Sequence, residues 1–451
     1  MGPKFFAGWK NNNICWCFWS CWWDLFDENT QLTNLDKLVF YSFEFFVFLA
    51  FTLVIYQLAR PVYRPFVLLM ASYSFYATIY LPHLAVLIWI SLISYFGARY
   101  LNKFRSKKNL FLFIFLVLIP LFVFKYFNFT NEFVKYFEGV EPFSLNLLIP
   151  VGISFYVFQS ISYLVDIYRK RIKAVMSIGE VALYLSFFPQ LLAGPIERSS
   201  KLCPQFQNLL EINSKNLHFG TKFILWGLFC KMAVSDNLAG IIDPILTNNH
   251  NHSAISLIAV LYLYSFQIYF DFLGYTNLAI GIARLFGIKL SNNFNRPYLA
   301  PSLQEFWRRW HITLSTWFRD YLYIPLGGKS NSFSKHMINI LLVFILSGLW
   351  HGASLNFLCW GFFHGCAYMI EDIFRKMNLI SFSYFSFPKI FITLAKVTLT
   401  FSVITLSWSF FLINDLSTIF SVFRKVFHYK VDIDYFSIAE SFFNFTNVAL
   451  I

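Results

Sequence analysis

Charged residues are scarce in this chain of 451 residues: they make up 13% of it, whereas hydrophobic residues make up 57%. Phenylalanine alone occurs 59 times. A soluble domain cannot bury that much apolar surface, so the composition indicates a membrane protein. Paired cysteine spacing is also missing, because the seven cysteines are scattered apart from a local group at Cys15, Cys17 and Cys21. We therefore expect neither a disulfide framework nor a zinc site.

Several well-known catalytic motifs are absent. The sequence contains no HExxH, P-loop, GxSxG or GxGxxG pattern in the context that each requires. The hypotheses of a serine-nucleophile hydrolase, an NTPase and a dinucleotide enzyme therefore lose support, and no resident metal is expected. The N-terminus also lacks the basic, apolar and small-residue order of a cleaved signal peptide.

Acidic residues are fewer than basic ones, which gives a net charge of +13. Such a charge is compatible with nucleic-acid binding. However, the basic residues cluster in short loops between apolar runs, which is the pattern of cytoplasmic loops in membrane proteins. We therefore expect membrane lipid, and no nucleic acid, as a partner.

Apolar runs predict about ten transmembrane helices. We expect them near residues 38–59, 65–81, 83–101, 109–127, 147–167, 217–234, 254–273, 336–350, 355–370 and 388–413. The loops after the first, third and fifth runs are rich in lysine and arginine, so they are predicted to be cytoplasmic, with the N-terminus outside. The expected fold class is an all-α, multi-pass protein of the cell (inner or plasma) membrane.

Three segments do not fit a span. Residues 181–193 form an apolar stretch too short to cross the membrane, and Pro189 and Gly194 break helices. We therefore expect a re-entrant segment on the cytoplasmic side. Residues 295–329 form a second one, whose interior from 303 to 323 reads as one helix with an aromatic stripe. Residues 1–37 are Trp-rich and too short to span, so they predict an interfacial extension before a membrane domain of residues 38–451.

His351 ends a long apolar run, between Trp350 and Gly352. A histidine at membrane depth is costly unless it faces the protein interior or a water-filled cavity. Small residues one turn earlier leave room for a substrate, the indole supplies an apolar wall, and partial desolvation suits a general base. The alternative, a histidine that only hydrogen-bonds a neighbouring helix, is equally supported by the residues alone.

His311 lies on a segment rich in arginine. The charges of Arg308, Arg309 and Arg319 are expected to lower the pKa of His311 and keep its ring neutral. The same arginines are suited to bind a phosphorylated donor such as coenzyme A. The alternative is that they meet anionic lipid, and the segment read alone slightly favours it.

Further residues are candidates for supporting roles. Asp271, in an aromatic helix, is expected to pair with an arginine or to orient a histidine, with structural pairing favoured over catalysis. Glu305 is the second acidic candidate, and Trp310 shares the aromatic stripe. His364 is expected to have a packing role rather than a catalytic one. The remaining histidines are expected to be solvated, namely His83, His218, His250, His252, His336 and His428.

Long stretches of the chain resemble the membrane-bound O-acyltransferase family. They are PVGISFYVFQSISYLVDIYRK, FFPQLLAGPIER, QIYFDFLGYTNLAIGIARLFGIKLSNNFNRPYLAPSLQEFWRRWHITLSTWFRDYLYIPLGG and LSGLWHGASLNFLCWGFFHG. The resemblance covers about residues 38–427 and is nearest to the alginate O-acetylation branch, which is related to the D-alanyl-transfer proteins of teichoic acid. It implies a ring of helices around a tunnel, with His351 of the WHG motif as principal catalytic residue and His311 of the RRWH motif as the second.

The resemblance also implies substrates and partners. The donor is a cytoplasmic acyl thioester, with acetyl-CoA expected, that docks near the arginine-rich segment without being a tightly bound cofactor. The acceptor is a hydroxyl of an extracytoplasmic polysaccharide, and a separate extracytoplasmic protein completes the transfer, because no soluble domain is fused here. Two departures stand out: residues 1–37 have no identified counterpart, and relatives commonly continue beyond the last helices present here. One or two C-terminal helices are therefore expected to be missing.

Three alternatives stay open. The first, within the enzyme class, is that the enzyme transfers a D-alanyl group or a longer acyl group. A longer acyl group needs a deeper apolar pocket. The second, from another class, is that the protein is a transporter or flippase for an envelope lipid. The lack of a convincing internal repeat argues against this hypothesis. The third is an inactive scaffold for a partner acetyltransferase, against which the intact His311 and His351 argue.

Overall fold

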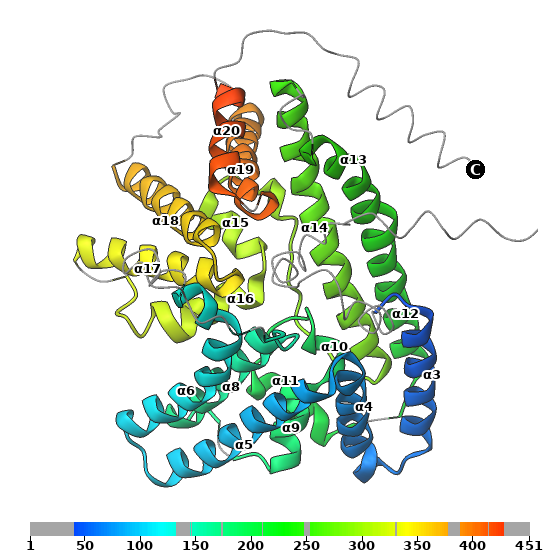
Figure 1. The fold of residues 1–451 in the computed structure, drawn as a ribbon. Coiled ribbons are helices and arrows are strands. Elements are labelled where there is room, and N and C mark those ends of the chain that lie inside the picture. Colours follow the sequence, from blue (N-terminus) through cyan, green and yellow to red (C-terminus); the bar gives the residue numbers. More distant parts are fainter. Residues whose placement is uncertain are drawn as a thin grey trace, which may run out of the picture.

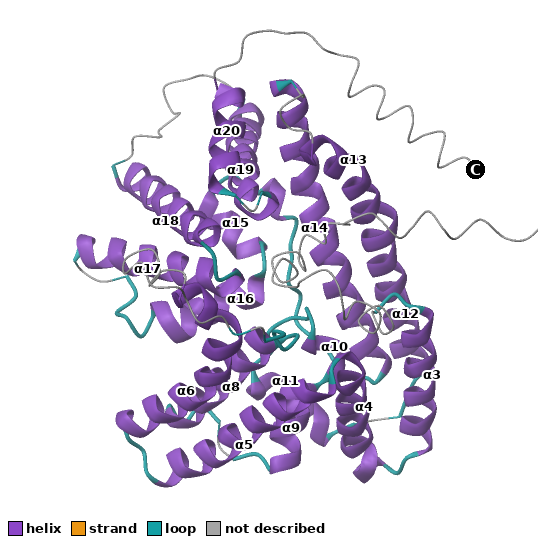
Figure 2. Cartoon of the chain, in the orientation of Figure 1, coloured by secondary structure: helices purple, strands orange, loops and turns teal. Residues whose placement is uncertain are grey.

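The computed structural model describes residues 40–131, 145, 147–172, 175–209, 211–247, 253–329, 332–377, 388–413 and 415–427. Every regular element within these ranges is a helix (Figure 2), as the sequence predicts. The predicted interfacial extension of residues 1–37 lies outside the described residues, as do His250, His252 and His428.

Within the described ranges, six helices are long and apolar enough to cross a membrane. They are Leu81–Lys103, Lys107–Asn131, Ser214–Leu246, Ala254–Leu285, Phe333–His351 and Lys389–Leu412. Three further expected spans form helices of 16 residues, namely α3 (Phe43–Leu58), α4 (Arg64–Ile79) and α8 (Ile153–Tyr168). A multi-pass membrane protein is therefore confirmed, while the number of ten spans stays a prediction.

One group of helices surrounds α8, which is buried over nearly its whole length. The helices α5 (Leu81–Lys103), α6 (Lys107–Leu121) and α9 (Ile178–Ser186) pack against it, and α4 covers α5 and α9 (Figure 1). The segment predicted to re-enter forms α9 and the short α10 (Phe188–Leu191), both buried. Pro189 is tolerated because it lies in the first turn of α10, where its missing N–H leaves no helical bond unmade.

The long helix α14 (Ala254–Leu285) is the central helix of a second group. The helices α12 (Ser214–Leu228), α13 (Asp236–Thr247), α19 (Lys389–Leu412) and α20 (Leu416–Phe427) pack against it, and so does the short α10. The sequence predicted that this span ends near residue 273, which is wrong, because the helix continues through Gly274 and Gly281. These glycines do not break α14 because the backbone of α12 packs directly on them.

Four glycines bring α12 and α14 together. A Cβ placed on Gly227 would lie 2.8 Å from the carbonyl oxygen of Gly274, and one on Gly220 would lie 2.9 Å from that of Gly281. The two glycines of each helix are about two turns apart, so they meet in antiparallel register. Close backbone approach through small residues is a main source of helix association in lipid, where apolar burial contributes little.

The chain between α12 and α14 differs from the prediction. The sequence analysis ends one span near residue 234 and begins the next at 254, but α12 continues through a π-helical turn, η3 (Phe229–Ser235), into α13. Lys231 in η3 is buried, and its Nζ lies 2.7 Å from the carboxylates of both Asp236 and Asp271. Asp271 therefore has a structural partner that is a lysine rather than an arginine or a histidine. A helix can therefore continue through a polar segment when the charged side chains of that segment form ion pairs.

The third group holds the arginine-rich segment. The helices α17 (Phe333–His351) and α18 (Leu355–Lys376) form an antiparallel pair, and α18 also contacts α15 (Leu303–Arg309) and α19. The single helix predicted over residues 303–323 is wrong. It is divided into α15, α16 (Ile312–Phe318) and the π-helical turn η6 (Arg319–Tyr323).

The glycine contacts predict the outcome of a matched pair of substitutions. Gly227→Ala should lower the free energy of unfolding by about 1–3 kcal/mol, because the new Cβ meets backbone atoms that cannot move aside. Gly179→Ala in α9 meets nothing within 4 Å, so it should leave stability unchanged or raise it slightly. Thermal unfolding of the detergent-solubilised protein measures both, and equal stability of the two variants would contradict the close-packing interpretation.

Candidate active site

His311 lies at the break between α15 and α16. Its backbone adopts the left-handed conformation, with φ of 41° and ψ of 54°, which costs about 1–3 kcal/mol for a residue with a side chain. A neighbouring segment replaces the helical hydrogen bonds: the N–H of Ile312 donates to the carbonyl of Asn293, and the N–H of Asn295 donates to the carbonyl of Arg309, both at 2.9 Å. The break is thus imposed by tertiary contacts.

The side chain of Asn293 fixes the tautomer of His311. Its Oδ1 accepts hydrogen bonds from the backbone N–H of Thr313 at 3.2 Å and from the Thr313 hydroxyl at 2.9 Å. Because a backbone N–H can only donate, the Asn293 atom that meets it must be the oxygen. His311 Nδ1, 3.1 Å from this oxygen, must then carry a proton. Nε2 is left with its lone pair, buried and without a hydrogen-bond partner.

The surroundings of His311 are aromatic rather than cationic. The residue is 1% exposed, and its ring packs edge-on against Phe272, with centroids 4.7 Å apart. Burial lowers the pKa of His311. The expectation of a neutral ring therefore stands, but its predicted cause, the charge of nearby arginines, is wrong.

His351 is the last residue of α17 and is half-buried. Its ring contacts Trp350, Trp360 and Phe411, with centroid distances of 4.8, 5.2 and 5.1 Å. The Trp350 ring also lies 6.0 Å from that of His311. The structure therefore brings the two histidines together on one indole, and we call His311, His351 and Trp350 the two-histidine centre.

The two tryptophans expected to support the site have different positions. Trp350 contacts both histidines, as described above. Trp310 is buried at the helix break, but it packs against Phe294 and Trp408, with centroids 5.1 and 5.0 Å away. Trp350 therefore forms a wall of the two-histidine centre, whereas Trp310 anchors the backbone that carries His311.

Buried polar atoms without a protein partner gather around the two-histidine centre. Besides His311 Nε2, they include the indole nitrogens of Trp350 and Trp360 and the amide nitrogen of Asn293. Buried polar groups are nearly always hydrogen-bonded in folded proteins. The grouping of these atoms beside both histidines is suited to the polar part of a substrate.

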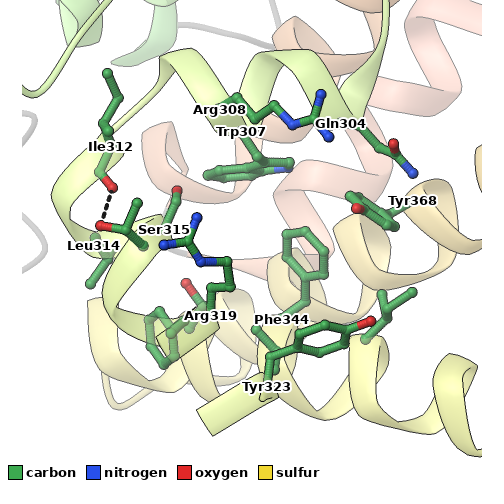
Figure 3. A pocket seen from close by; sticks show the side chains of 15 residues that line it. Gln304, Trp307, Arg308, Ile312, Leu314, Ser315, Arg319, Tyr323, Phe344 and Tyr368 are labelled. Carbon is green, nitrogen blue, oxygen red and sulfur yellow. Dashed lines mark hydrogen bonds between the residues drawn. The ribbon is translucent and has the colours of Figure 1, made fainter. Parts of the chain in front are cut away.

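A pocket of about 500 Å³ adjoins the centre (Figure 3). Ile312, which follows His311, and Ser347, one turn before His351, both line it. Figure 3 shows Trp307 and Arg308 along one wall and Tyr323 along the opposite one. The volume is within the range of about 300–1,000 Å³ that is typical of small-molecule sites.

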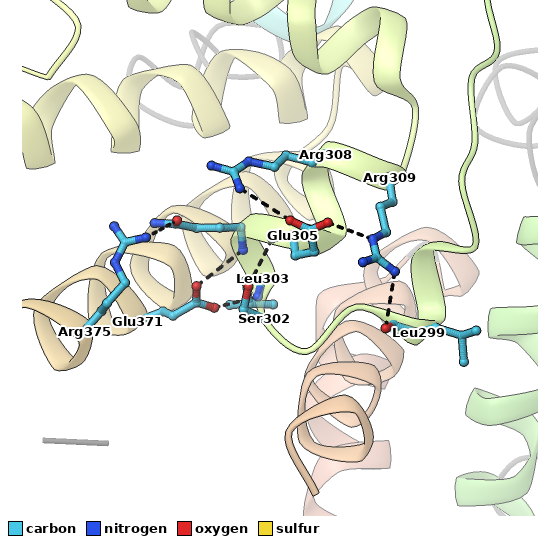
Figure 4. Close-up of polar contacts among 9 residues, drawn as sticks. Leu299, Ser302, Leu303, Glu305, Arg308, Arg309, Glu371 and Arg375 are labelled. Carbon is cyan, nitrogen blue, oxygen red and sulfur yellow. Dashed lines mark hydrogen bonds and ion pairs between the residues drawn. The ribbon is translucent and has the colours of Figure 1, made fainter. Parts of the chain in front are cut away.

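The structure separates the three arginines that the sequence grouped. Arg308 and Arg319 line the pocket, whereas Arg309 does not. Figure 4 shows Glu305 between Arg308 and Arg309, with ion-pair distances of 3.4 and 2.9 Å. Arg309 also donates to the carbonyl of Leu299 at 3.4 Å. The Arg309 guanidinium lowers the pKa of Glu305, so this acidic candidate is a charged anchor within α15.

The N-terminus of α15 is held by α18. The backbone N–H of Leu303 donates to the Glu371 carboxylate at 2.6 Å (Figure 4). A carboxylate at this position satisfies an unpaired helix N–H and is favoured by the helix dipole. Arg375 binds Gln304 on the same turn. The pocket wall that carries Arg308 is therefore tied to α18 rather than held by its own short helix.

Comparison with known proteins assigns a family to this arrangement. The family model for MBOAT, the membrane-bound O-acyltransferase family, matches residues 12–413. The chain belongs to this family. It is therefore a multi-pass membrane protein and an O-acyltransferase. The match begins inside the predicted N-terminal extension of residues 1–37.

Curated relatives of this acyltransferase are named for alginate, peptidoglycan or teichoic acid. The chain is 35% identical to a probable alginate O-acetylase of Pseudomonas aeruginosa over 394 residues, which are 85% of this chain and 74% of the relative. It is 35% identical to a peptidoglycan O-acetyltransferase of Helicobacter pylori over 402 residues, 81% of this chain and 74% of the relative. A teichoic acid D-alanyltransferase of Streptococcus thermophilus is 27% identical over 316 residues, 65% of this chain and 72% of the relative.

Lys125 is a residue of the candidate active site that the sequence analysis missed. It lies in the π-helical turn η2 (Phe122–Tyr126), which continues α6, and it is only 6% exposed. Its ammonium group donates to the backbone carbonyls of Trp350 and His351. The available signal was a lysine within an apolar run, because ionisable residues at membrane depth are rare and usually have a role.

The other histidines of the acyltransferase only partly follow the prediction. His83 and His336 are buried rather than solvated, and they bond to a backbone carbonyl and to Tyr323, respectively. Both predictions were wrong because a position near a helix end does not reveal which neighbouring helix covers it. His218 is exposed, as expected. His364 is fully buried against aromatic rings and bonds a serine hydroxyl, which agrees with the expected packing role.

The role of Asn293 can be tested directly. Asn293→Ala removes the acceptor that fixes the proton on His311 Nδ1, so acyl transfer should fall about a hundredfold, within the range that a correctly protonated acid–base group contributes. Asn213→Ala is the matched control, because Asn213 also accepts a backbone N–H, at 2.8 Å, but at the remote start of α12. Transfer per folded molecule is measured for both variants. Similar rates in the two would exclude tautomer control by Asn293.

Proposed function

We propose that the protein transfers an acetyl group from a cytoplasmic thioester to a hydroxyl of an extracytoplasmic polysaccharide or of an acyl-accepting partner protein. The observation that carries the proposal is the meeting of His311 and His351 on Trp350, beside a pocket that presents two arginines. The names of the relatives at 35% identity, an alginate O-acetylase and a peptidoglycan O-acetyltransferase, support the acetyl group and the polymer acceptor.

The pocket favours acetyl-CoA as the donor. Guanidinium groups bind phosphate oxygens in a bidentate manner, and Arg308 and Arg319 both line the pocket. Trp307, Tyr323 and Phe344 add aromatic surface for the remainder of the donor. Arg309 is not assigned to donor binding, because it does not line this pocket.

The histidines then supply proton transfer. His351 takes the proton of the acceptor hydroxyl while the hydroxyl oxygen attacks the thioester carbonyl carbon. The tetrahedral intermediate collapses as the C–S bond breaks, and protonated His351 returns the proton to the departing thiolate. His311 positions the donor through its unprotonated Nε2 or assists the proton transfer. The unpaired indole N–H groups nearby are suited to stabilise the oxyanion.

The proposal includes an orientation in the membrane. The arginine-rich segment is placed on the cytoplasmic side, where acyl thioesters are made, with the N-terminus outside and the chain in the inner or plasma membrane. The lysine- and arginine-rich loops of the sequence support this orientation. A separate extracytoplasmic protein is proposed to carry the acyl group onward, because the polymer lies beyond the membrane.

D-alanyl transfer is the second candidate. It is supported by the teichoic acid D-alanyltransferase at 27% identity. A D-alanyl group carries an ammonium ion, which a carboxylate would stabilise. The described residues that line the pocket include two arginines and no carboxylate, so the acetyl group fits better.

The central prediction concerns the two histidines. Membranes incubated with acetyl-CoA labelled in the acetyl group should pass label to an extracytoplasmic protein or glycan. His351→Ala should abolish this transfer while the protein stays folded, because it removes the base, and His311→Ala should reduce it strongly. The molecule that becomes labelled identifies the acceptor. Equal labelling by wild type and His351→Ala would remove His351 from catalysis.

The arginines predict a change in donor affinity. Arg308→Gln and Arg319→Gln should each raise the KM for acetyl-CoA about tenfold with little change in kcat, because each loses a charge-assisted contact to phosphate. Arg309→Gln should have a smaller effect, since Arg309 lies outside the pocket. Arg99→Gln is the control, because that exposed arginine bonds Tyr95 in α5. If Arg309→Gln raised KM most, the pocket assignment would be wrong.

A further inference from the structure

The carboxyl end of α17 needs hydrogen-bond partners from elsewhere. The last backbone bond of this helix runs from the N–H of Gly352 to the carbonyl of Gly348, at 3.2 Å. The carbonyls of Leu349, Trp350 and His351 therefore have no helical partner. In a membrane protein no bulk water reaches such groups at depth, and an unsatisfied carbonyl is costly there.

Two consecutive residues of η2 supply these partners. The hydroxyl of Tyr126 donates to the carbonyl of Leu349 at 2.8 Å. The ammonium group of Lys125 donates to the carbonyl of Trp350 and, at 3.3 Å, to that of His351. A cation at this end of a helix is also attracted by the helix dipole. All three orphan carbonyls are thus bound by one turn of another helix.

The contacts of Lys125 assign it to the backbone rather than to a substrate. An ammonium group has three protons to donate. Besides the two carbonyls, Lys125 Nζ lies 3.5 Å from the hydroxyl oxygen of Ser154 in α8. These contacts fit the ammonium group to hold the end of α17 against η2 and α8.

The turn that carries Lys125 has an unusual local structure. It is a π-helical turn that follows Pro120, a residue that cannot donate its backbone nitrogen to the preceding turn. Such turns are rare and are frequent at functional sites. A lysine is also expensive in an apolar helix unless it faces protein groups, and here the groups that it faces are the last carbonyls of α17.

We propose that Lys125 is a positioning residue that directs the His351 imidazole toward the reacting atoms by fixing the carboxyl end of α17. His351 is the terminal residue of that helix, so the direction of its side chain follows the geometry of the last turn. Tyr126 completes the same contact one carbonyl earlier. The inference rests on the proposed role of His351 as the base.

Lys125→Met removes the cation and keeps an unbranched side chain. Its kcat should fall about a hundredfold with the KM for acetyl-CoA unchanged, because a small misplacement of the base slows chemistry without weakening donor binding. Lys125→Arg restores a cationic donor and should recover most of the lost kcat. Rates are expressed per folded molecule, measured by size-exclusion chromatography of the solubilised protein.

Two tyrosines provide a matched control. Tyr126 and Tyr76 each donate a hydroxyl hydrogen bond of 2.8 Å to a backbone carbonyl, that of Leu349 at the end of α17 and that of Val151 before α8, respectively. Tyr126→Phe should lower kcat, whereas Tyr76→Phe should leave it unchanged. If both variants lose the same activity, or neither loses any, the α17 cap has no special link to catalysis.

The outcomes separate this inference from the proposed function. A wild-type kcat in Lys125→Met, or a loss explained entirely by a smaller folded fraction, would overturn the positioning role. If Lys125→Met does not fold, the recovery in Lys125→Arg and the tyrosine pair decide the question. His351→Ala is measured in parallel: full activity in that variant would refute the proposed base. An inactive His351→Ala with a fully active Lys125→Met would refute the positioning role alone.

Discussion

The need of every buried backbone group for a hydrogen-bond partner shapes the site of this acyltransferase. Helices satisfy this need along their length, but their ends do not. Both histidines lie where a helix is interrupted, His311 at a break and His351 at a C-terminus. Side chains and backbone from distant segments complete the bonding at each place, through Asn293 and Lys125. Both histidines therefore lie where a helix leaves backbone groups without a helical partner and another segment supplies one.

Charge is distributed in keeping with this arrangement. Around the two-histidine centre the neighbours are aromatic rings, and burial lowers the pKa of His311. The cationic groups that could meet a phosphorylated donor lie in the adjoining pocket, at Arg308 and Arg319. The two-histidine centre and the arginines of the pocket are thus adjacent, with the histidine rings facing aromatic side chains. Elsewhere, the buried Lys231 and Asp271 form an ion pair.

Several errors of the sequence interpretation share one physical origin. Hydrophobic periodicity records which face of a continuous helix is apolar, and it carries no information on hydrogen bonds made by residues far along the chain. The predicted helix over residues 303–323 followed the periodicity correctly on each side of His311 but missed the break that Asn293 imposes. The helix expected to end near residue 234 continues to Thr247, because Lys231 pairs with the charge of Asp236.

The sequence by itself determined the membrane class, the all-helical fold, the family and the two histidine motifs, because these depend on composition and on local order along the chain. The tertiary structure decided the tautomer of His311, the separation of Arg309 from the pocket and the contact of Lys125 with α17. The first and the last of these depend on partners that the fold brings together from other segments of the chain. Lys125 and Trp350, for example, are 225 residues apart in the chain, and spacing along the chain could not have revealed their contact.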